Sequence, residues 1–332
     1  MRRRDFLRVT AASGATALLG ARATPAAAEP PPEVTTLVLH GSPTGLCIAP
    51  QYVAEDLLKA EGFAEVRYLP KSRVGANQAL ASGEINFTSA FIGNYVVQLD
   101  AGDPLVVLAG LHIGCFELFA SDRIRTIRDL KGKTVSVSEL GAGRHVFLAS
   151  AMAYVGLDPR KDVTFVAHSG PESMRLLADG KIDGYQAFGE EVPEMRAKKI
   201  GHVVLSSTLD RPWSQYFCCV VAANREFARK NPIATKRALR AILKASTVCA
   251  LEPDRAVRLL VEKGYTREPE FVRQMLKELP YTRWRDLGLE DTIRFYAVRM
   301  HEAGFIKSTP QKLLAQGTDR RFLDEIRKEL KG

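Results

Sequence analysis

Hydrophobic positions along the first half of the chain alternate between two periods. Short β-branched or aliphatic runs predict buried strands at 35–39, 66–69, 85–88 and 105–108. Segments with helical spacing lie between them at 51–60, 76–81 and 92–99. Because helices of this length connect consecutive strands, the strands are expected to run parallel, which predicts an α/β fold.

A second set of alternating elements follows after about residue 130. Strands are predicted at 134–137, 163–167, 184–187 and 203–205, with helices at 145–155, 172–178 and 192–198. One more strand, 216–222, precedes a region that is almost entirely helical. We expect those last helices to pack on the first set, so the chain crosses between two lobes near 120–122 and near 211–214. Two crossings of this kind form a hinge beside a cleft.

The N-terminal residues have the order of an export signal. Arg3-Arg4-Asp5-Phe6-Leu7-Arg8 fits the twin-arginine pattern, a weakly apolar stretch covers 9–20, and Ala26-Ala27-Ala28 offers a cleavage site. An amphipathic anchor helix on a membrane surface is the alternative, although Ser, Gly and Thr within 9–20 make a poor anchor. The sequence therefore predicts cleavage after Ala28, a short spacer at 29–33, and a periplasmic protein.

Charge and cysteine content argue against a nucleic-acid-binding protein and against a metalloprotein. The 332 residues carry a formal net charge of +9, but the basic residues are scattered, so no nucleic-acid partner is expected. Five cysteines, an odd number, show no spacing of a metal site and are interpreted as small buried hydrophobic residues: Cys47, Cys115, Cys218, Cys219 and Cys249. Neither a metal nor a cofactor is expected.

Four segments resemble the type II periplasmic solute-binding proteins. They are ALASGEINF (79–87), IRDLKGKTVSV (127–137), GLDPRKDV (156–163) and LADGKID (177–183). In the first of them, Asn86 stands where Asp is more usual. The resemblance covers nearly all of 33–332 and is strongest to the subfamily that binds aliphatic sulfonates, nitrate, taurine or thiamine-pyrimidine precursors for ABC importers.

The resemblance implies an α/β fold of the two-lobe periplasmic binding protein type II. Each lobe would be a mainly parallel sheet flanked by helices, with a hinge of two crossovers and a helical C-terminal region. Lobe 1 would comprise 34–121 and 213–332, and lobe 2 would comprise 122–212.

The function implied is that of the substrate-binding component of an ABC transporter. It would be a monomer that captures a small, anionic, sulfonate-like solute and delivers it to the transmembrane subunits of a permease. The alternative is a protein that binds a pyrimidine or thiamine precursor, or a related cofactor-synthesis enzyme. No catalytic Ser-His-Asp order or paired-carboxylate motif is present, so an enzyme is not expected. A periplasmic sensor partner is a third possibility.

In open α/β sheets, ligands bind beyond the carboxyl ends of the strands, which selects short loops. The candidate ligand-binding residues are Thr44, Leu46, Ser89, His112, Ser138, Gly141, Gly143, Arg144, Phe188, Glu190 and Trp213.

The strongest chemistry lies at Gly141-Ala142-Gly143-Arg144. Backbone N–H groups at a helix start and the Arg144 guanidinium could bind an anion together, although an ordinary turn with Arg144 in solvent is the alternative. His112 could bind a ligand or be structural, and Trp213 could cover a ligand or pack the hinge. Glu190 at a helix start is stabilised there by the helix dipole; if it faces the cleft, it favours a zwitterion or a pyrimidine over a sulfonate.

Overall fold

The computed structural model describes residues 29–41, 45–69 and 75–330. The predicted export signal, 1–28, lies outside these ranges. Contacts divide the chain into Met1–Pro31 and Pro32–Gly332, and the architecture below is that of the second unit. Among the described residues, no helix is both long enough and apolar enough to cross a membrane.

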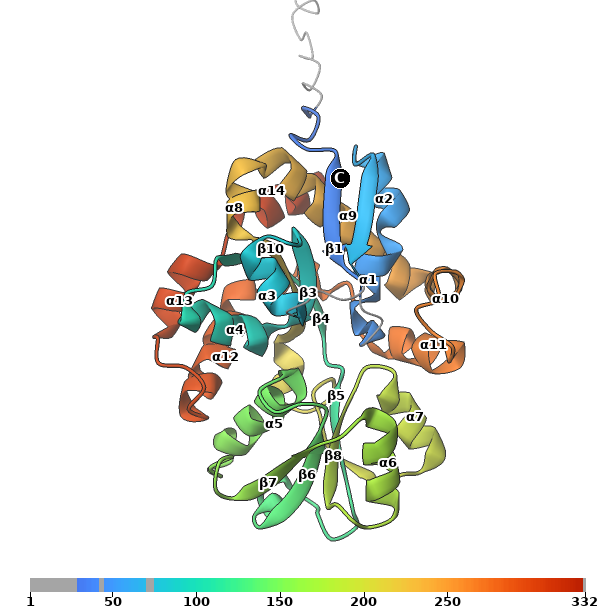
Figure 1. Cartoon of the computed structure of the whole chain (residues 1–332), viewed down its shortest axis with the longest axis vertical. Helices are drawn as coiled ribbons and strands as arrows, with labels where there is room; N and C mark the ends of the chain where they lie inside the picture. Colours follow the sequence, from blue (N-terminus) through green and yellow to red (C-terminus); the bar gives the residue numbers. More distant parts are fainter. Residues whose placement is uncertain (1–28, 42–44, 70–74, 331–332) are drawn as a thin grey trace, which may run out of the picture. The chain divides into compact units, whose positions relative to one another are not determined.

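Two mixed sheets of five strands carry the fold (Figure 1). The first has the order β2-β1-β3-β10-β4 and the second the order β7-β6-β8-β5-β9. The strands of the first sheet are β1 (Thr36–His40), β2 (Glu65–Leu69), β3 (Phe87–Phe91), β4 (Leu105–Ile113) and β10 (Phe217–Asn224). Those of the second are β5 (Phe116–Ala120), β6 (Lys133–Val137), β7 (Val163–Ala167), β8 (Gly184–Phe188) and β9 (His202–Ser206).

One strand in each sheet runs against the other four. In the first sheet, β10 is antiparallel to β3 and β4, while β1 is parallel to β2 and β3. In the second, β5 is antiparallel to β8 and β9, while β6 is parallel to β7 and β8. The expectation of mainly parallel sheets is therefore confirmed, and the antiparallel strand is in each case the one entered from the other sheet.

Strand β5 is the element that the sequence pattern did not predict. Only Gly114 and Cys115 separate it from β4, and no turn signal of several residues marks the change of sheet. Both residues have positive φ values, 81° and 94°, which turn the chain within this short link. Because β5 pairs within the second sheet, we propose that the first crossing lies at 113–116 rather than at 120–122.

Helices cover both sheets. Those between strands are α1 (Ala49–Val53), α2 (Glu55–Ala60), α3 (Gly75–Ser82), α4 (Ile92–Ala101), α5 (Gly143–Tyr154), α6 (Gly170–Ala178) and α7 (Glu191–Lys198). The C-terminal helices are α8 (Arg225–Lys230), α9 (Pro232–Leu251), α10 (Pro253–Glu262), α11 (Pro269–Glu278), α12 (Leu289–Glu302), α13 (Pro310–Gly317) and α14 (Arg321–Glu329). Several of them pack on helices that connect strands of the first sheet, with α9 against α1 and α2 and α13 against α4. In addition, α11 contacts α7 and α12 contacts α5, so this region also touches helices of the second sheet.

The same hydrogen-bond pattern occurs once in each sheet, between a residue just before a strand and the neighbouring parallel strand. Asn86 accepts a hydrogen bond from the Val38 N–H at 2.7 Å through Oδ1, and its own N–H donates to the Val38 carbonyl at 2.8 Å. Asp183 makes the equivalent pair with Thr134, at 3.0 and 2.8 Å. An amide or a carboxylate serves equally as this acceptor, which explains why Asn86 can stand where Asp is more usual.

A cluster of aromatic rings forms around Trp213, which starts a short 3-10 helix (Trp213–Gln215) before β10. Its ring lies edge-on to Phe147 of α5 at 5.3 Å between centroids and to Phe295 of α12 at 5.2 Å. The Trp213 side chain is buried, with 2% of the residue exposed. Edge-to-face contacts of this kind add to the large apolar area that an indole buries.

We therefore predict that Trp213→Ala lowers the free energy of unfolding by about 3–5 kcal/mol, because it leaves a large cavity among these rings. Urea denaturation followed by circular dichroism measures the change. The control is Leu209→Ala, since Leu209 is 74% exposed and its removal should change stability by less than about 0.5 kcal/mol. Equal effects of the two substitutions would contradict the packing role of Trp213.

Candidate functional site

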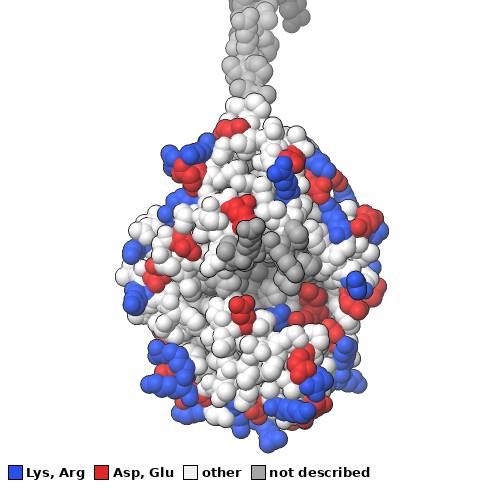
Figure 2. Space-filling model, in the orientation of Figure 1, with Lys and Arg blue, Asp and Glu red and all other residues white. Residues whose placement is uncertain are grey.

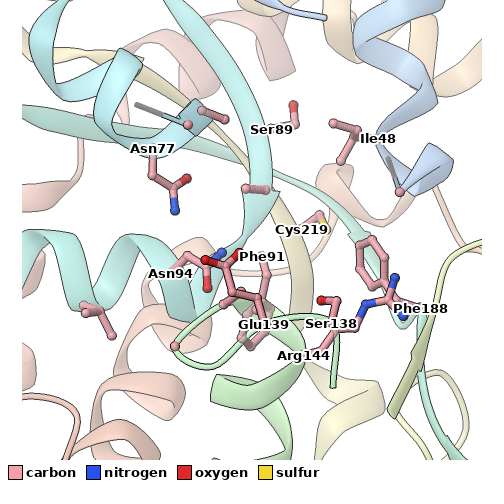
Figure 3. Close-up of a pocket in the computed structure, with 18 of the residues that line it drawn as sticks. Ile48, Asn77, Ser89, Phe91, Asn94, Ser138, Glu139, Arg144, Phe188 and Cys219 are labelled. Atoms are coloured by element: carbon pink, nitrogen blue, oxygen red, sulfur yellow. The ribbon is translucent and has the colours of Figure 1, made fainter. Parts of the chain in front are cut away.

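A cavity of about 760 Å³ lies where the carboxyl ends of strands from both sheets meet. Its described lining comes from the end of β1 and the residues after it, the start of α3, the end of β3, helix α4, the start of β5, the segment between β6 and α5, the end of β8, and β10 (Figure 3). Figure 2 shows one face of the molecule with a hollow near its middle and with basic and acidic residues interspersed around it. The volume is in the range of small-molecule sites.

Uncharged polar side chains line the side of the cavity formed by α3 and α4. Gln98 donates from Nε2 to the Asn77 carbonyl at 3.0 Å and to Asp103 Oδ2 at 2.9 Å. The Ser89 Oγ, the Asn94 Oδ1 and the Gln98 Oε1 are buried and have no hydrogen-bond partner among the described residues. Because buried acceptors without partners are costly, these atoms are suited to receive N–H or O–H donors from a ligand.

Phenylalanine rings form the apolar wall of the cavity. The rings of Phe91 and Phe116 lie edge to face with centroids 5.1 Å apart, and the ring of Phe188 is 4.8 Å from that of Phe116. Gly45, with φ 78°, packs directly on Phe188, and a Cβ at this position would overlap the ring. The wall can therefore receive the face or edge of a planar ligand.

The segment Ser138–Arg144 enters the cavity at the start of α5. Gly141 has φ 83° and donates its N–H to His145 Nδ1 at 2.9 Å. The residue before the helix, Ala142, gives it no side-chain cap, so the N–H groups of the first turn can serve a ligand. Gly143 lies close to Asn94 across the cavity, with 3.4 Å between an ideal Cβ and Asn94 Nδ2.

The Arg144 guanidinium is already paired within the protein. It forms a two-point ion pair with Glu191, in which Nη2 donates to Oε1 at 3.0 Å, and it also donates to the Tyr185 hydroxyl at 2.5 Å. The two side chains are only 16% and 18% exposed. Burial alone would lower the pKa of Arg144, but the Glu191 carboxylate more than offsets this and raises it. Most of the cationic charge expected to attract an anion is thus neutralised by Glu191.

The sequence-predicted site residues divide into two groups. Ser89, Ser138, Gly141, Gly143, Arg144 and Phe188 line the cavity, whereas Leu46, His112, Glu190 and Trp213 are buried or packed outside its lining. Thr44 lies outside the described residues. All remain predicted contacts, and only the first group is carried forward as proposed ligand contacts.

Several lining residues were not predicted from the sequence. Asn77, Asn94 and Gln98 lie within helices, and Phe91 and Phe116 lie on strands, so a rule that selects loops after strands does not reach most of them. The amides at positions 94 and 98 share one face of α4, since residues four apart are neighbours on a helix. That pair of neighbouring amides on a mainly apolar helix was the signal available.

The sequence also gave no indication that four potential metal ligands come together. One nitrogen of His112 and the Sγ atoms of Cys47, Cys115 and Cys219 all lie within 4.8 Å of one another. All four residues are buried, and Cys219 also lines the cavity. The chain therefore places a buried sulfur and nitrogen cluster directly behind the site.

Glu190 links the segment after β8 to the segment after β1. The Leu46 N–H donates to Glu190 Oε2 at 3.1 Å. Burial of the carboxyl raises the pKa of Glu190 to about 7. The folded protein therefore holds this proton at pH values where an ordinary carboxyl group has lost it.

We predict that Glu190 makes the protein less stable as the pH rises from about 4.3 to about 7, because only the unfolded chain releases the proton easily in that range. The contribution of Glu190 to the free energy of unfolding should fall by roughly 3 kcal/mol between these pH values and stay constant at higher pH. Glu190→Gln, which keeps the acceptor for Leu46, should remove this slope. Urea denaturation at several pH values tests it, with Glu84→Gln, an exposed residue, as the control. A Glu190→Gln curve parallel to the wild type would refute the assignment.

Comparison with solved structures identifies the fold. The alkanesulfonate-binding protein SsuA from Xanthomonas axonopodis pv. citri, bound to MOPS, superposes with a TM-score of 0.69 at 17% identity, covering 89% of this chain and 100% of that one. The periplasmic nitrate-binding protein NrtA from Synechocystis PCC 6803 gives 0.71 at 14% identity, with 91% and 90% covered. The desulfurization enzyme DSZB gives 0.60 at 16% identity, with 89% and 99% covered. The fold is therefore that of the periplasmic binding proteins.

Sequence comparison places the chain more specifically. No match was found among curated proteins. The sequence profile described as NMT1/THI5 like matches residues 48–256, which is more than half of the chain and spans both sheets. The chain belongs to the NMT1/THI5-like family.

Proposed function

We propose that the protein is the solute-binding component of an ABC importer, exported to the periplasm and acting as a monomer. The observation that carries this proposal is the cavity between the carboxyl edges of two sheets, which the chain joins by crossings before β5 and before β10. Two crossings allow the lobes to close on a solute, and the closed form would deliver it to the transmembrane subunits of a permease. The sulfonate-binding and nitrate-binding neighbours support this role.

The solute that fits the cavity best is a small nitrogen heterocycle of the pyrimidine class, rather than a simple sulfonate. A planar ring matches the Phe91, Phe116 and Phe188 wall, and ring amino groups match the acceptors at Ser89, Asn94 and Gln98. Acceptor atoms of the ring can face the N–H groups at the start of α5. A sulfonate would use those N–H groups too, but the guanidinium beside them is held by Glu191.

Binding, rather than catalysis, is the proposed role of this site. Among the described lining residues, Cys219 is the one cysteine. Its Sγ lies within a cluster of three further ligand atoms instead of beside a single base, an arrangement unlike the nucleophile and base pair of a thiol enzyme. A thiamine-precursor enzyme remains the alternative function, and turnover of any bound solute would support it.

We predict that a thermal-shift screen stabilises the protein more with aminopyrimidines than with alkanesulfonates, nitrate or taurine. A ligand at about 100 times its dissociation constant adds about 2.7 kcal/mol to the free energy of unfolding, which such a screen detects easily. Asn94→Leu should weaken binding of the best pyrimidine about tenfold, because a donor of the ligand loses its acceptor. Tighter binding of sulfonates by the wild type would refute the proposed solute class while leaving the importer role in place.

We also predict that Glu191→Gln increases affinity for alkanesulfonates about tenfold, since it frees the Arg144 guanidinium for charge-assisted hydrogen bonds. Affinity for a neutral pyrimidine should change much less. Isothermal titration calorimetry measures both, with Glu194→Gln as the matched control because Glu194 lies on the same helix and pairs with Lys198. An unchanged sulfonate affinity in Glu191→Gln would show that the pair does not limit anion binding.

A further inference from the structure

We propose that Cys47, His112, Cys115 and Cys219 form a four-coordinate site for a thiophilic metal ion, with zinc as the ion that fits the ligand set. Three thiolates and one imidazole are a typical structural zinc set. Oxygen-seeking ions such as magnesium or calcium would not be selected, because the set contains no oxygen ligand. This proposal is independent of which solute enters the cavity.

The fold draws these four side chains from separate segments to one point. Cys47 lies in the short 3-10 helix after β1, His112 lies on β4, Cys115 is in the link between the sheets, and Cys219 is on β10. Their ligand atoms lie within 4.8 Å of one another. In a tetrahedral zinc site with Zn–S bonds of about 2.3 Å, the sulfurs are about 3.8 Å apart. Side-chain shifts of an ångström or less would bring the cluster to that geometry.

His112 is oriented as a metal-binding histidine. Its Nδ1 lies 3.1 Å from the Ile113 carbonyl oxygen, and its Nε2 is buried without a hydrogen-bond partner among the described residues. An Nδ1–H that donates to a carbonyl leaves the Nε2 lone pair free for a metal, the arrangement that orients most metal-ligating histidines. The same geometry leaves Nε2 unsatisfied if no ion binds, and a buried nitrogen without a partner is costly.

The backbone around two of the cysteines is shaped to bring their sulfurs inward. Cys115 adopts φ 94°, a conformation that is strained for a non-glycine residue. The pairing of β10 with β4 shifts register on both sides of Cys219, and bulges of this kind re-aim a side chain. The Tyr281 hydroxyl donates to the Cys47 carbonyl at 2.8 Å and holds the third cysteine in place. Such strained backbone at a cluster of potential ligands is expected where the free energy of metal binding offsets the strain.

A bound ion would cross-link three segments of the chain next to the cavity. The ion would join the segment after β1 to the link before β5 and to β10, the strand that follows the second crossing. On binding, the three thiols would release their protons to the solvent, and the resulting thiolates would be neutralised in part by the metal ion. Because protons are released, the affinity for the metal should rise with pH. With four protein ligands the site is closed, which is the pattern of structural rather than catalytic zinc.

A competing outcome involves Cys218, which is not in the cluster. Its Sγ lies 3.2 Å from the Cys115 Sγ, close enough that a disulfide between them is the main alternative. That bond would remove Cys115 from the set of metal ligands. The fifth cysteine, Cys249, is buried on α9 and lies outside the cluster, and it supplies a matched control.

The test is a cobalt titration of the reduced, metal-free full chain. We expect one equivalent of Co²⁺ to give the visible d–d bands of a tetrahedral site and a thiolate charge-transfer band in the near ultraviolet, and one equivalent of Zn²⁺ to remove them. Cys249→Ser should keep these spectra, whereas Cys219→Ser and Cys47→Ser should lose or strongly shift them. Zinc should also raise the melting temperature of the wild type and of Cys249→Ser, but not that of the ligand variants.

A second measurement keeps the proposal testable if the ligand variants do not fold, which circular dichroism would show. Native mass spectrometry of the reduced wild type, dialysed with zinc and then desalted, should show one Zn²⁺ per chain, and Cys249→Ser should show the same. Absence of cobalt bands in the reduced wild type would overturn the proposal. A wild-type chain without bound zinc would do so as well, as would a Cys115–Cys218 disulfide that re-forms in the presence of zinc.

Discussion

The structure depends on one constraint of direction, which is that both sheets point the carboxyl ends of their parallel strands at the same space. A chain that leaves β4 at that end must enter the second sheet from the cavity side, so β5 can only run away from it and lies antiparallel to its neighbours. The return from β9 to β10 obeys the same rule. The mixed pairing of each sheet and the position of the cavity are therefore consequences of a single geometric requirement.

Charge pairing then decides what the cavity can hold. A helix start beside an arginine suggests an anion site, but the hydrogen bonds of Arg144 to Glu191 and Tyr185 use the guanidinium before any solute arrives. The other lining groups include amides, hydroxyls and phenyl rings, together with the Glu139 carboxylate and the His40 imidazole. Recognition by such groups depends on the pattern of donors and acceptors and on planarity, and depends less on net charge.

The sequence was sufficient for the elements that have local signals. Aliphatic and β-branched runs located nine of the ten strands found among the described residues, and the segments SGEIN (82–86) and DGKID (179–183) end at Asn86 and Asp183, which bond to the neighbouring strand. Strand β5 was missed because Gly114 and Cys115 turn the chain between sheets without a longer loop. The partner of Arg144 was missed because Glu191 is 47 residues away and reaches it only because α5 and α7 both pack on β8. Contacts of this kind leave no periodic pattern to read.

The cysteines show most clearly why spacing alone is a poor guide to chemistry in this fold. Metal motifs are recognised when ligands lie a few residues apart on one turn or hairpin, whereas His112 and Cys219 are more than a hundred residues apart and meet as partners across β4 and β10. Cys219 on β10 therefore belongs both to the lining of the cavity and to the cluster of potential metal ligands. In the proposed opening of the lobes, any ion held there would lie against the segments that move, so its binding would be coupled to the width of the cavity. Reciprocity of linked equilibria then requires the solute to affect the metal as much as the metal affects the solute.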